Sequence, residues 1–213
     1  MAERKRPRRT RERILETALA LFNRFGEPNV TTADIAAEMG ISPGNLYYHF
    51  RNKNQIIGEL FGALERRLGA LLVPARGGAG VEDLWLVLHL LFEAMWDYRF
   101  FFRDLDEIVS RDRRLASRFA LILRRGVRTV TELCRALVAA GAMRASEGEI
   151  AALAENVALV ATYWISYQSI STVQPSERRA DLDRAAYQVL SLVAPFLLGD
   201  ARALLERLSR DYV

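Results

Sequence analysis

The chain has little cysteine and little histidine. Cys134 is the only cysteine in 213 residues, so no disulfide can form within the chain and several thiolates cannot share a metal ion. Two histidines, no clustered metal-ligand spacing and no glycine-rich phosphate loop beside a strand leave little material for catalysis. We expect no metal, no other cofactor and no enzyme, and an all-α enzyme is the remotest alternative.

Long apolar runs are missing as well. No stretch reaches the roughly 18 uninterrupted apolar residues of a membrane span, because Glu155 and Asn156 break the longest apolar-rich segment, 150–165. The basic N-terminus leads into no apolar signal-type run. We expect a cytoplasmic protein without a membrane segment. Cys134 lies on an apolar helical stripe and is interpreted as a packing residue.

The positive charge of the chain is concentrated at one end. Ten of the 30 Lys and Arg residues and six of the 26 Asp and Glu residues lie in 1–53, so that segment carries the whole net charge of +4. The remainder has 20 of each and no net charge. Such asymmetry indicates an anionic partner of the first quarter rather than a fold.

Alternating strand patterns are absent, and apolar residues recur at helical spacing, so we predict an all-α fold. Residues 1–9 contain a proline and no apolar periodicity and are predicted to be a disordered basic arm, either solvated or in contact with DNA. The expected helices are 10–25, 31–40, 42–50, 53–73, 81–98, 101–110, 112–140, 146–172, 177–198 and 200–210.

Residues 31–53 have the features of a helix-turn-helix. Thr31 or Thr32 caps a two-turn helix that ends at Gly40, and Ser42 followed by Pro43 starts the next. In such motifs the second helix enters the DNA major groove. The start of this helix can meet a phosphate and Gly44 allows close backbone approach, while Asn45 can bind a base edge. The alternative is a compact three-helix subdomain with surface tyrosines.

Two longer stretches, ILETALALFNRFG and VTTADIAAEMGISPGNLYYHFRNKNQII, resemble the N-terminal domain of the tetracycline-repressor (TetR) family of bacterial regulators. The resemblance implies a one-component transcriptional regulator, usually a repressor, that is an all-α homodimer with a larger ligand-binding domain. We expect a DNA-binding domain at 10–55 and a ligand-binding and dimerisation domain at 56–213. Pro43 departs from members with a longer polar side chain there. The implied DNA-contacting residues are Thr32, Ala33, Ser42, Pro43, Gly44, Asn45, Tyr47, Tyr48, His49 and Lys53.

Two sets of residues in the C-terminal part are candidates for further roles. Aromatic and polar residues at helical spacing either line an apolar pocket or fill a core: Trp85, His89, Phe92, Trp96, Phe119, Tyr163, Trp164 and Tyr167. Apolar and small residues in the last two long helices are the dimerisation candidates: Ala154, Ala158, Ala161, Ile165, Val189, Val193 and Phe196.

The leading hypothesis is a ligand-responsive repressor. A twofold dimer predicts a palindromic operator in double-stranded DNA. A small, apolar effector of unknown identity would release the operator by moving the 53–73 helix. The alternative is a DNA-binding dimer without a small-molecule effector.

Overall fold

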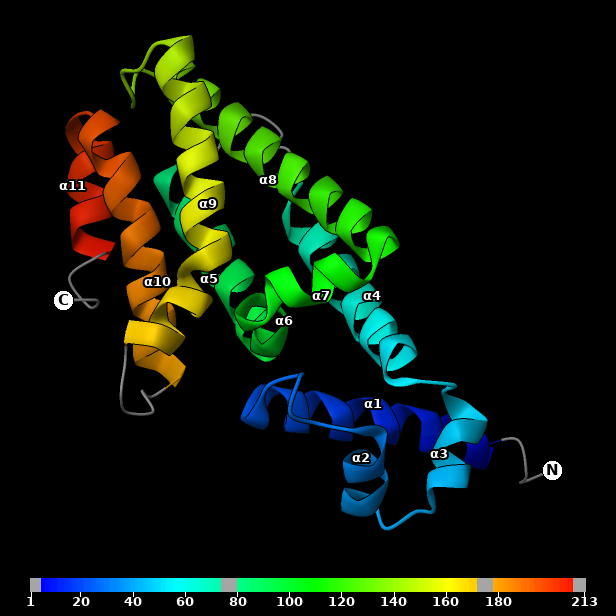
Figure 1. Ribbon diagram of the computed structural model, residues 1–213. Helices are drawn as coiled ribbons and strands as arrows, with labels where there is room; N and C mark the ends of the chain where they lie inside the picture. The colour runs from blue at the N-terminus through cyan, green and yellow to red at the C-terminus, as the bar shows by residue number, and fades with distance from the viewer. Residues whose placement is uncertain (1–4, 74–79, 172–177, 209–213) are drawn as a thin grey trace.

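The computed structural model describes residues 5–73, 80–171 and 178–208, and every element within them is helical (Figure 1). The only β-type pairing in these ranges is an isolated bridge between Met143 and Leu197. The predicted all-α class is therefore confirmed. A small N-terminal group of helices sits below a larger C-terminal group, with α4 passing from one to the other (Figure 1).

The first helix starts earlier than the sequence suggested. Helix α1 spans Lys5–Phe25 instead of beginning at Thr10. Residues 5–9, assigned to a disordered arm, are therefore helical, and residues 1–4 lie outside the described part of the chain. Pro7 falls in the first turn, where its missing N–H has no intrahelical partner to lose.

Helices α1, α2 (Thr32–Glu38) and α3 (Pro43–His49) enclose a small apolar core. Phe22, Ile35, Leu46 and Phe50 are fully buried in it. Leu46 and Phe50 point inward as their four-residue spacing predicted, which leaves the other faces of α3 free to meet a partner.

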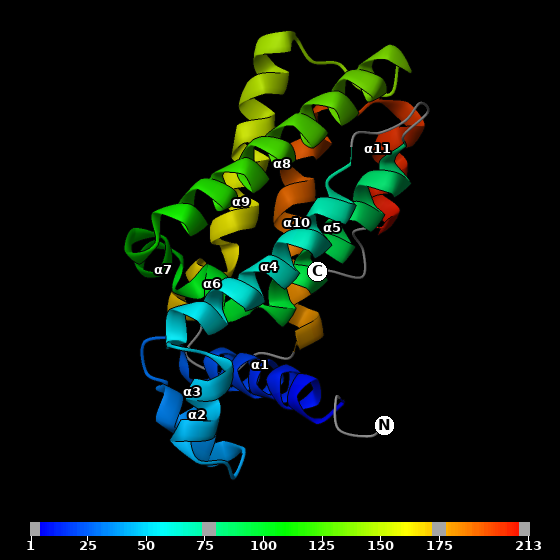
Figure 2. The same ribbon diagram turned by 90° about the vertical axis from the view of Figure 1, so that its right-hand side faces the viewer.

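Helix α4 (Lys53–Leu71) belongs to both groups of helices. It packs on α1 near its beginning and on α5 and α8 farther along (Figure 2). Its buried residues run from Ile56 to Leu68 without a break in the core. The predicted boundary near residue 55 falls at the start of this helix and stays a prediction.

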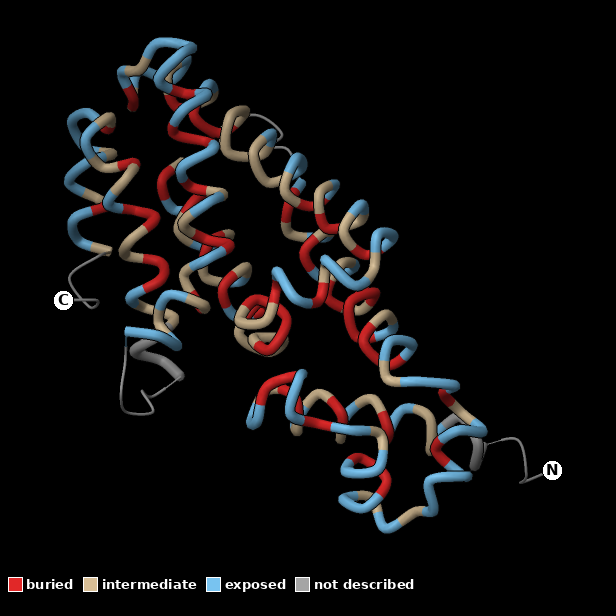
Figure 3. The backbone as a smooth tube through the Cα atoms, in the orientation of Figure 1, coloured by how far each residue is buried: buried red, intermediate tan, exposed pale blue. Residues whose placement is uncertain are grey.

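The C-terminal group is built around α5 (Val81–Asp97), α8 (Arg113–Ala139), α9 (Glu147–Ser171) and α10 (Arg178–Val193). Helix α9 packs on α8 and α10, and α10 packs on α5. The chain continues through a 3-10 turn (Ala194–Phe196) into α11 (Gly199–Leu208). The buried residues of these helices lie where the helices face one another (Figure 3).

The helix expected at 101–110 is wrong. Two shorter helices replace it, α6 (Arg99–Arg103) and α7 (Leu105–Arg111), which meet at Asp104. The Asp104 backbone leaves the helical region there, with φ −105° and ψ 24°. Phenylalanines 100–102 are buried in the core, while Arg103 and Asp104 bond the backbone of the N-terminal group.

Helix α9 is long and apolar enough, by length and composition alone, to cross a membrane, and it is the single such helix in the described residues. Core helices of other proteins meet the same test. In this chain one face of α9 is buried against its neighbours, from Ile150 to Ile165.

Cys134 is buried, as its position on an apolar stripe predicted. Burial raises the pKa of its thiol to about 11, so the thiolate is scarce at neutral pH. We expect the folded protein to react with an aromatic disulfide reagent at pH 7.5 at least about a hundredfold more slowly than the urea-unfolded chain. Equal rates in the two states, followed by absorbance, would show that α8 opens freely around this residue.

Candidate nucleic-acid interface and effector cavity

The start of α2 is fixed by a complete capping box. The Thr31 hydroxyl accepts from the Asp34 amide at 3.2 Å, and the Thr31 amide donates to Asp34 Oδ2 at 2.8 Å. These hydrogen bonds from Thr31 hold the pKa of Asp34 below its ordinary value. The cap is therefore intact at neutral pH and is lost as the pH falls through the folded-state pKa of Asp34.

The turn between α2 and α3 is equally well defined. Gly40 ends α2 with φ +63°, a left-handed conformation that suits glycine. Ser42 Oγ then accepts from the Asn45 amide at 3.2 Å, and Pro43 occupies the first helical position. These local bonds set the angle at which α3 leaves the turn.

The predicted DNA-contacting residues of α2 and α3 mostly lie on one outer surface, which we name the recognition surface (residues 32, 33, 42–45, 47, 48 and 49). Six of its members on α3 and its cap are exposed, and His49 is half-buried. Tyr48 is 81% exposed, which is unusual for an aromatic side chain, and touches His49 edge to face. An aromatic ring held in solvent on a rigid helix indicates a surface that meets a partner.

A hydrogen bond joins the two helices across the recognition surface. Thr32 Oγ1 and Tyr47 Oη lie 3.0 Å apart. The pair links the start of α2 to the middle of α3, so Tyr47 is positioned before any partner arrives. The hydroxyl that accepts in this pair keeps its own O–H and can donate it to a phosphate.

Lys53 differs from the other predicted DNA-contacting residues because its ammonium group has partners within the chain. Its ammonium group donates to the Glu27 and Val30 carbonyl oxygens at 2.9 and 3.0 Å and lies 2.8 Å from Glu27 Oε1. A phosphate contact would require the ammonium to leave these partners. The family pattern placed Lys53 on DNA, but contacts with residues more than 20 positions away occupy it.

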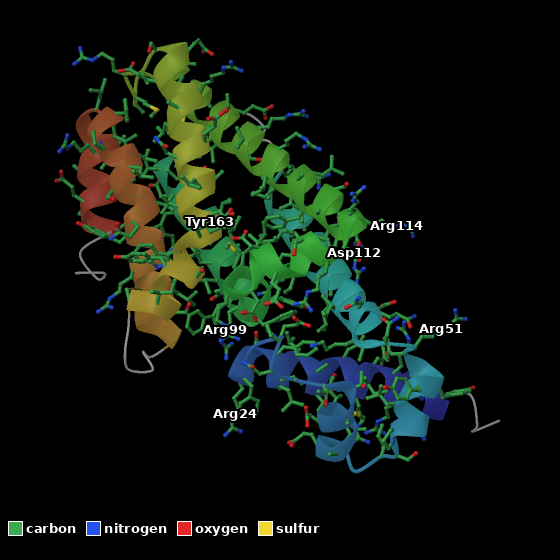
Figure 4. The ribbon with its side chains drawn as sticks, in the orientation of Figure 1. Arg24, Arg51, Arg99, Asp112, Arg114 and Tyr163 are labelled. Atoms are coloured by element: carbon green, nitrogen blue, oxygen red, sulfur yellow. The ribbon has the colours of Figure 1, made fainter. Side chains whose placement is uncertain are left out.

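Arg51 is an exposed cation that is not among the predicted DNA-contacting residues. Its side chain lies at the junction between α3 and α4, beside the recognition surface (Figure 4). Its position directly after the motif, together with its charge, was a signal that could have identified it. A guanidinium there can contact a phosphate that flanks the groove.

A second candidate site is an apolar cavity of about 60 Å³ inside the C-terminal group. Helices α4, α5, α6, α8 and α9 all contribute to its wall. The wall is almost entirely apolar, and the Thr162 hydroxyl in it donates to the Ala158 carbonyl of its own helix at 2.7 Å. The lining residues are Leu68, Leu72, Leu91, Met95, Phe102, Phe119, Ile122, Leu123, Gly126, Ala158, Ala161 and Thr162.

Of the eight predicted ligand residues, only Phe119 lines this cavity. The ring centroids of Trp85 and His89 lie 4.3 Å apart on the side of α5 that faces α10. His89 Nε2 lies 3.9 Å from Asp183 Oδ1 of α10. Leu91 and Met95 are the residues of α5 that line this cavity, and a ligand role for Trp85 and His89 stays a prediction. The remaining five are placed elsewhere: Phe92 in the core, Trp96 and Trp164 half-buried, and Tyr163 and Tyr167 exposed.

A larger open groove of about 680 Å³ lies between the start of α5, the end of α8 and α11. Its wall includes Leu137, Ala142 and Leu204 but no residue of α4 or α6. A ligand there would touch neither α4 nor α6, which line the smaller cavity and also pack on α1, so the smaller cavity is the stronger effector candidate despite its size.

The predicted dimerisation residues also need correction. Ala154, Ala161, Ile165, Val189 and Val193 are buried inside the chain itself, so they cannot meet a second copy. Ala158, at the cavity, and Phe196 are half-buried. The unpartnered surface of α9 lies on its opposite face.

That opposite face carries an exposed apolar stripe. Leu159, Tyr163, Tyr167 and Ile170 follow one another at helical spacing and are 58%, 42%, 60% and 82% exposed. We name these four residues the α9 stripe; Tyr163 is labelled in Figure 4. Its spacing was visible in the sequence, but its tyrosines were assigned to a ligand pocket.

Two family models match this chain, and both describe bacterial regulatory proteins. Residues 14–60 match a family model described as bacterial regulatory proteins, tetR family, and residues 63–205 match one described as bacterial transcriptional repressor. A crystal structure of a TetR-family transcriptional regulator from Marinobacter aquaeolei VT8 is 36% identical, with a TM-score of 0.85. That alignment covers 95% of this chain and 98% of the other.

Curated relatives match over a shorter part. The HTH-type transcriptional regulator AcrR of Shigella flexneri is 34% identical over 62 residues, which are 29% of each chain. The HTH-type transcriptional regulator TtgR of Pseudomonas putida is 31% identical over 84 residues, 39% of this chain and 40% of its own. The matched part therefore spans less than half the length of these curated relatives.

Proposed function

Because this chain belongs to the TetR family of bacterial regulatory proteins, we propose that it is a cytoplasmic transcriptional repressor that binds a palindromic operator as a dimer and leaves it when a small apolar effector binds. The recognition surface is the observation that carries this proposal. It combines a capped, rigid helix-turn-helix with exposed Asn45 and Tyr48 in the part of the chain that holds all the excess positive charge.

The side chains on and beside the recognition surface would contact different parts of the DNA. Asn45 is exposed near the start of α3 and can bond a base edge in the major groove. Tyr47, Tyr48 and Arg51 can contact phosphates and sugars on either side. Phosphate contacts set affinity and its salt dependence, whereas Asn45 would supply sequence preference.

The effector would act by enlarging the inner cavity. Small-molecule sites usually enclose about 300–1,000 Å³, several times the volume seen here. An effector therefore has to push helices apart, and Leu68 and Leu72 place the last turns of α4 in the cavity wall. Because α4 packs on α1 and follows the recognition helix α3 directly in the chain, this movement would displace the recognition helix. A ligand shifts the protein only by binding the displaced arrangement more tightly.

Dimerisation would use the α9 stripe. Its four large apolar side chains form a contiguous surface, and a twofold interface buries the same surface on both copies. The same stripe would exist in a dimer that has no effector, so the cavity distinguishes the two alternatives. If no apolar compound raises the thermal stability of the protein, the effector-free alternative is favoured.

Replacing Asn45 or Tyr47 by alanine is expected to weaken operator binding about 5- to 100-fold each. Each change removes a contact to a base or phosphate without touching the buried core. The operator is first selected from random duplexes with the wild-type protein, and affinities are then measured by fluorescence anisotropy at several salt concentrations. Arg114→Ala, on the outer side of α8 (Figure 4), is the control and should leave affinity unchanged. Equal, weak binding by all four proteins would contradict a sequence-specific DNA interface.

A further inference from the structure

The turn between α1 and α2 is attached to the C-terminal helices by a buried carboxylate. Glu27 is 0% exposed, although it is charged and lies in a loop. Arg111 of α7 donates to its Oε2 at 2.8 Å, and Lys53 of α4 lies 2.8 Å from its Oε1. One side chain of the N-terminal group thus holds cations from two other elements.

Further directional bonds join the same two regions. Arg103 of α6 donates to the Phe22 carbonyl oxygen at 2.9 Å, and the Glu27 amide donates to Asp104 Oδ2 at 2.9 Å. Asn23 donates to the Asp97 carbonyl oxygen at 2.8 Å and accepts from the Phe100 amide at 3.1 Å. We name Glu27, Arg103, Asp104 and Arg111 the turn clamp.

Helix α6 connects the turn clamp to the cavity over very few residues. Phe100 packs on Phe22 of α1 with ring centroids 5.2 Å apart. Phe102 lines the cavity and lies 6.3 Å from the ring of Phe119. Arg103, the next residue, donates to the Phe22 carbonyl oxygen near the end of α1. A shift of α6 caused by cavity contents would therefore reach the turn clamp within one residue.

The N-terminal helices are attached to the C-terminal helices in two ways, through α4 and through the turn clamp. Helix α4 alone leaves α1–α3 able to bend or rotate about its beginning. The turn clamp adds bonds from α6 and α7 to the last turn of α1 and the turn that follows it (Figure 1), and these bonds oppose such a rotation. Ion pairs and hydrogen bonds suit this task because they break when their partners slide, whereas apolar contacts tolerate sliding.

We propose that the turn clamp fixes the orientation of the recognition helix relative to the C-terminal domain and thereby sets the operator spacing that the dimer accepts. The proposal rests on the proposed function, since it concerns how that same DNA-binding surface is held. Dimers read two half-sites at a distance given by protein geometry. Loss of the turn clamp should relax this distance while leaving each recognition surface intact.

The test uses the full-length double variant Arg103→Ala/Arg111→Ala, which leaves the recognition surface unchanged. Operators selected with the wild-type protein are remade with one base pair inserted or removed at the centre. Wild type is expected to lose about tenfold or more in affinity for each altered spacing, and the variant about threefold or less. Arg113→Ala/Arg114→Ala, two exposed arginines of α8, is the matched control and should discriminate spacing like wild type.

The outcomes separate the two proposals. If selection with wild type yields no specific sequence, the proposed function itself fails. If a specific operator is found and the clamp variant keeps the wild-type discrimination, the turn clamp does not set spacing. Circular dichroism checks folding; should the double variant unfold, Arg111→Gln alone is used, because Lys53 still faces Glu27. The proposal is overturned if Arg111→Gln discriminates operator spacing as wild type does and its Glu27 amide exchanges hydrogen no faster than in wild type.

Discussion

Leu159→Arg is expected to convert the proposed dimer to a monomer and to weaken operator binding at least about a hundredfold, because the second half-site is then no longer bound in the same event. Leu159 lies in the α9 stripe and is 58% exposed, so arginine fits the single chain without strain. In a twofold interface the two introduced charges would be brought close together without partners. Analytical ultracentrifugation gives the oligomeric state, and anisotropy gives the affinity.

A matched control for this change lies on α8. Leu121 is 56% exposed, nearly the same as Leu159, but it lies on a different helix face. Leu121→Arg should leave both the dimer and operator affinity at wild-type values. A dimer that survives Leu159→Arg and Tyr167→Arg would show that the second copy docks elsewhere.

Glu27→Gln is expected to lower the free energy of unfolding by about 2–3 kcal/mol. Removing one member of a buried ion pair usually costs about 3–5 kcal/mol. We expect a smaller loss here because Arg111 is 41% exposed and solvent screens part of its charge. Urea unfolding followed by circular dichroism measures the loss. For a chain of this length the corresponding fall in melting temperature is about 4–12 °C.

Glu107→Gln provides the comparison for that change, because Glu107 also pairs with Arg111 at 2.8 Å but is 54% exposed. Its replacement should cost less than about 0.5–1 kcal/mol, as expected for surface pairs. The Glu27 effect should also persist at high salt, since ions screen buried pairs weakly. Equal costs for the two variants would mean that solvent reaches Glu27.

The helix-turn-helix could be predicted from the sequence because its signals are local. Thr31 bonds Asp34 and Ser42 bonds Asn45, in each case three residues away, so spacing and cap chemistry are enough. The four-residue spacing of Leu46 and Phe50 likewise separated the inner from the outer face of α3. The resemblance to a family then indicated what the outer face meets.

The roles of the C-terminal residues could not be predicted in this way. Helix α9 carries apolar side chains on almost every side, so periodicity did not distinguish Ile165, which is buried, from Tyr167, which is exposed. The Lys53 contacts depend on Glu27, whose other partner Arg111 lies 84 residues away in sequence. Such contacts follow from packing between helices, and no pattern within one helix contains them.

Helix α4 has a consequence for recombining this protein with its relatives. Its beginning packs on α1 while its end lines the apolar cavity, so a DNA-binding module cut at residue 55 would lose the helix that completes its core. The turn clamp adds a second requirement, because α6 and α7 must come from the same parent as the α1–α2 turn. A functional chimera should therefore inherit α1–α4 together with residues 97–111, and only the helices beyond them can be exchanged to change what the regulator senses.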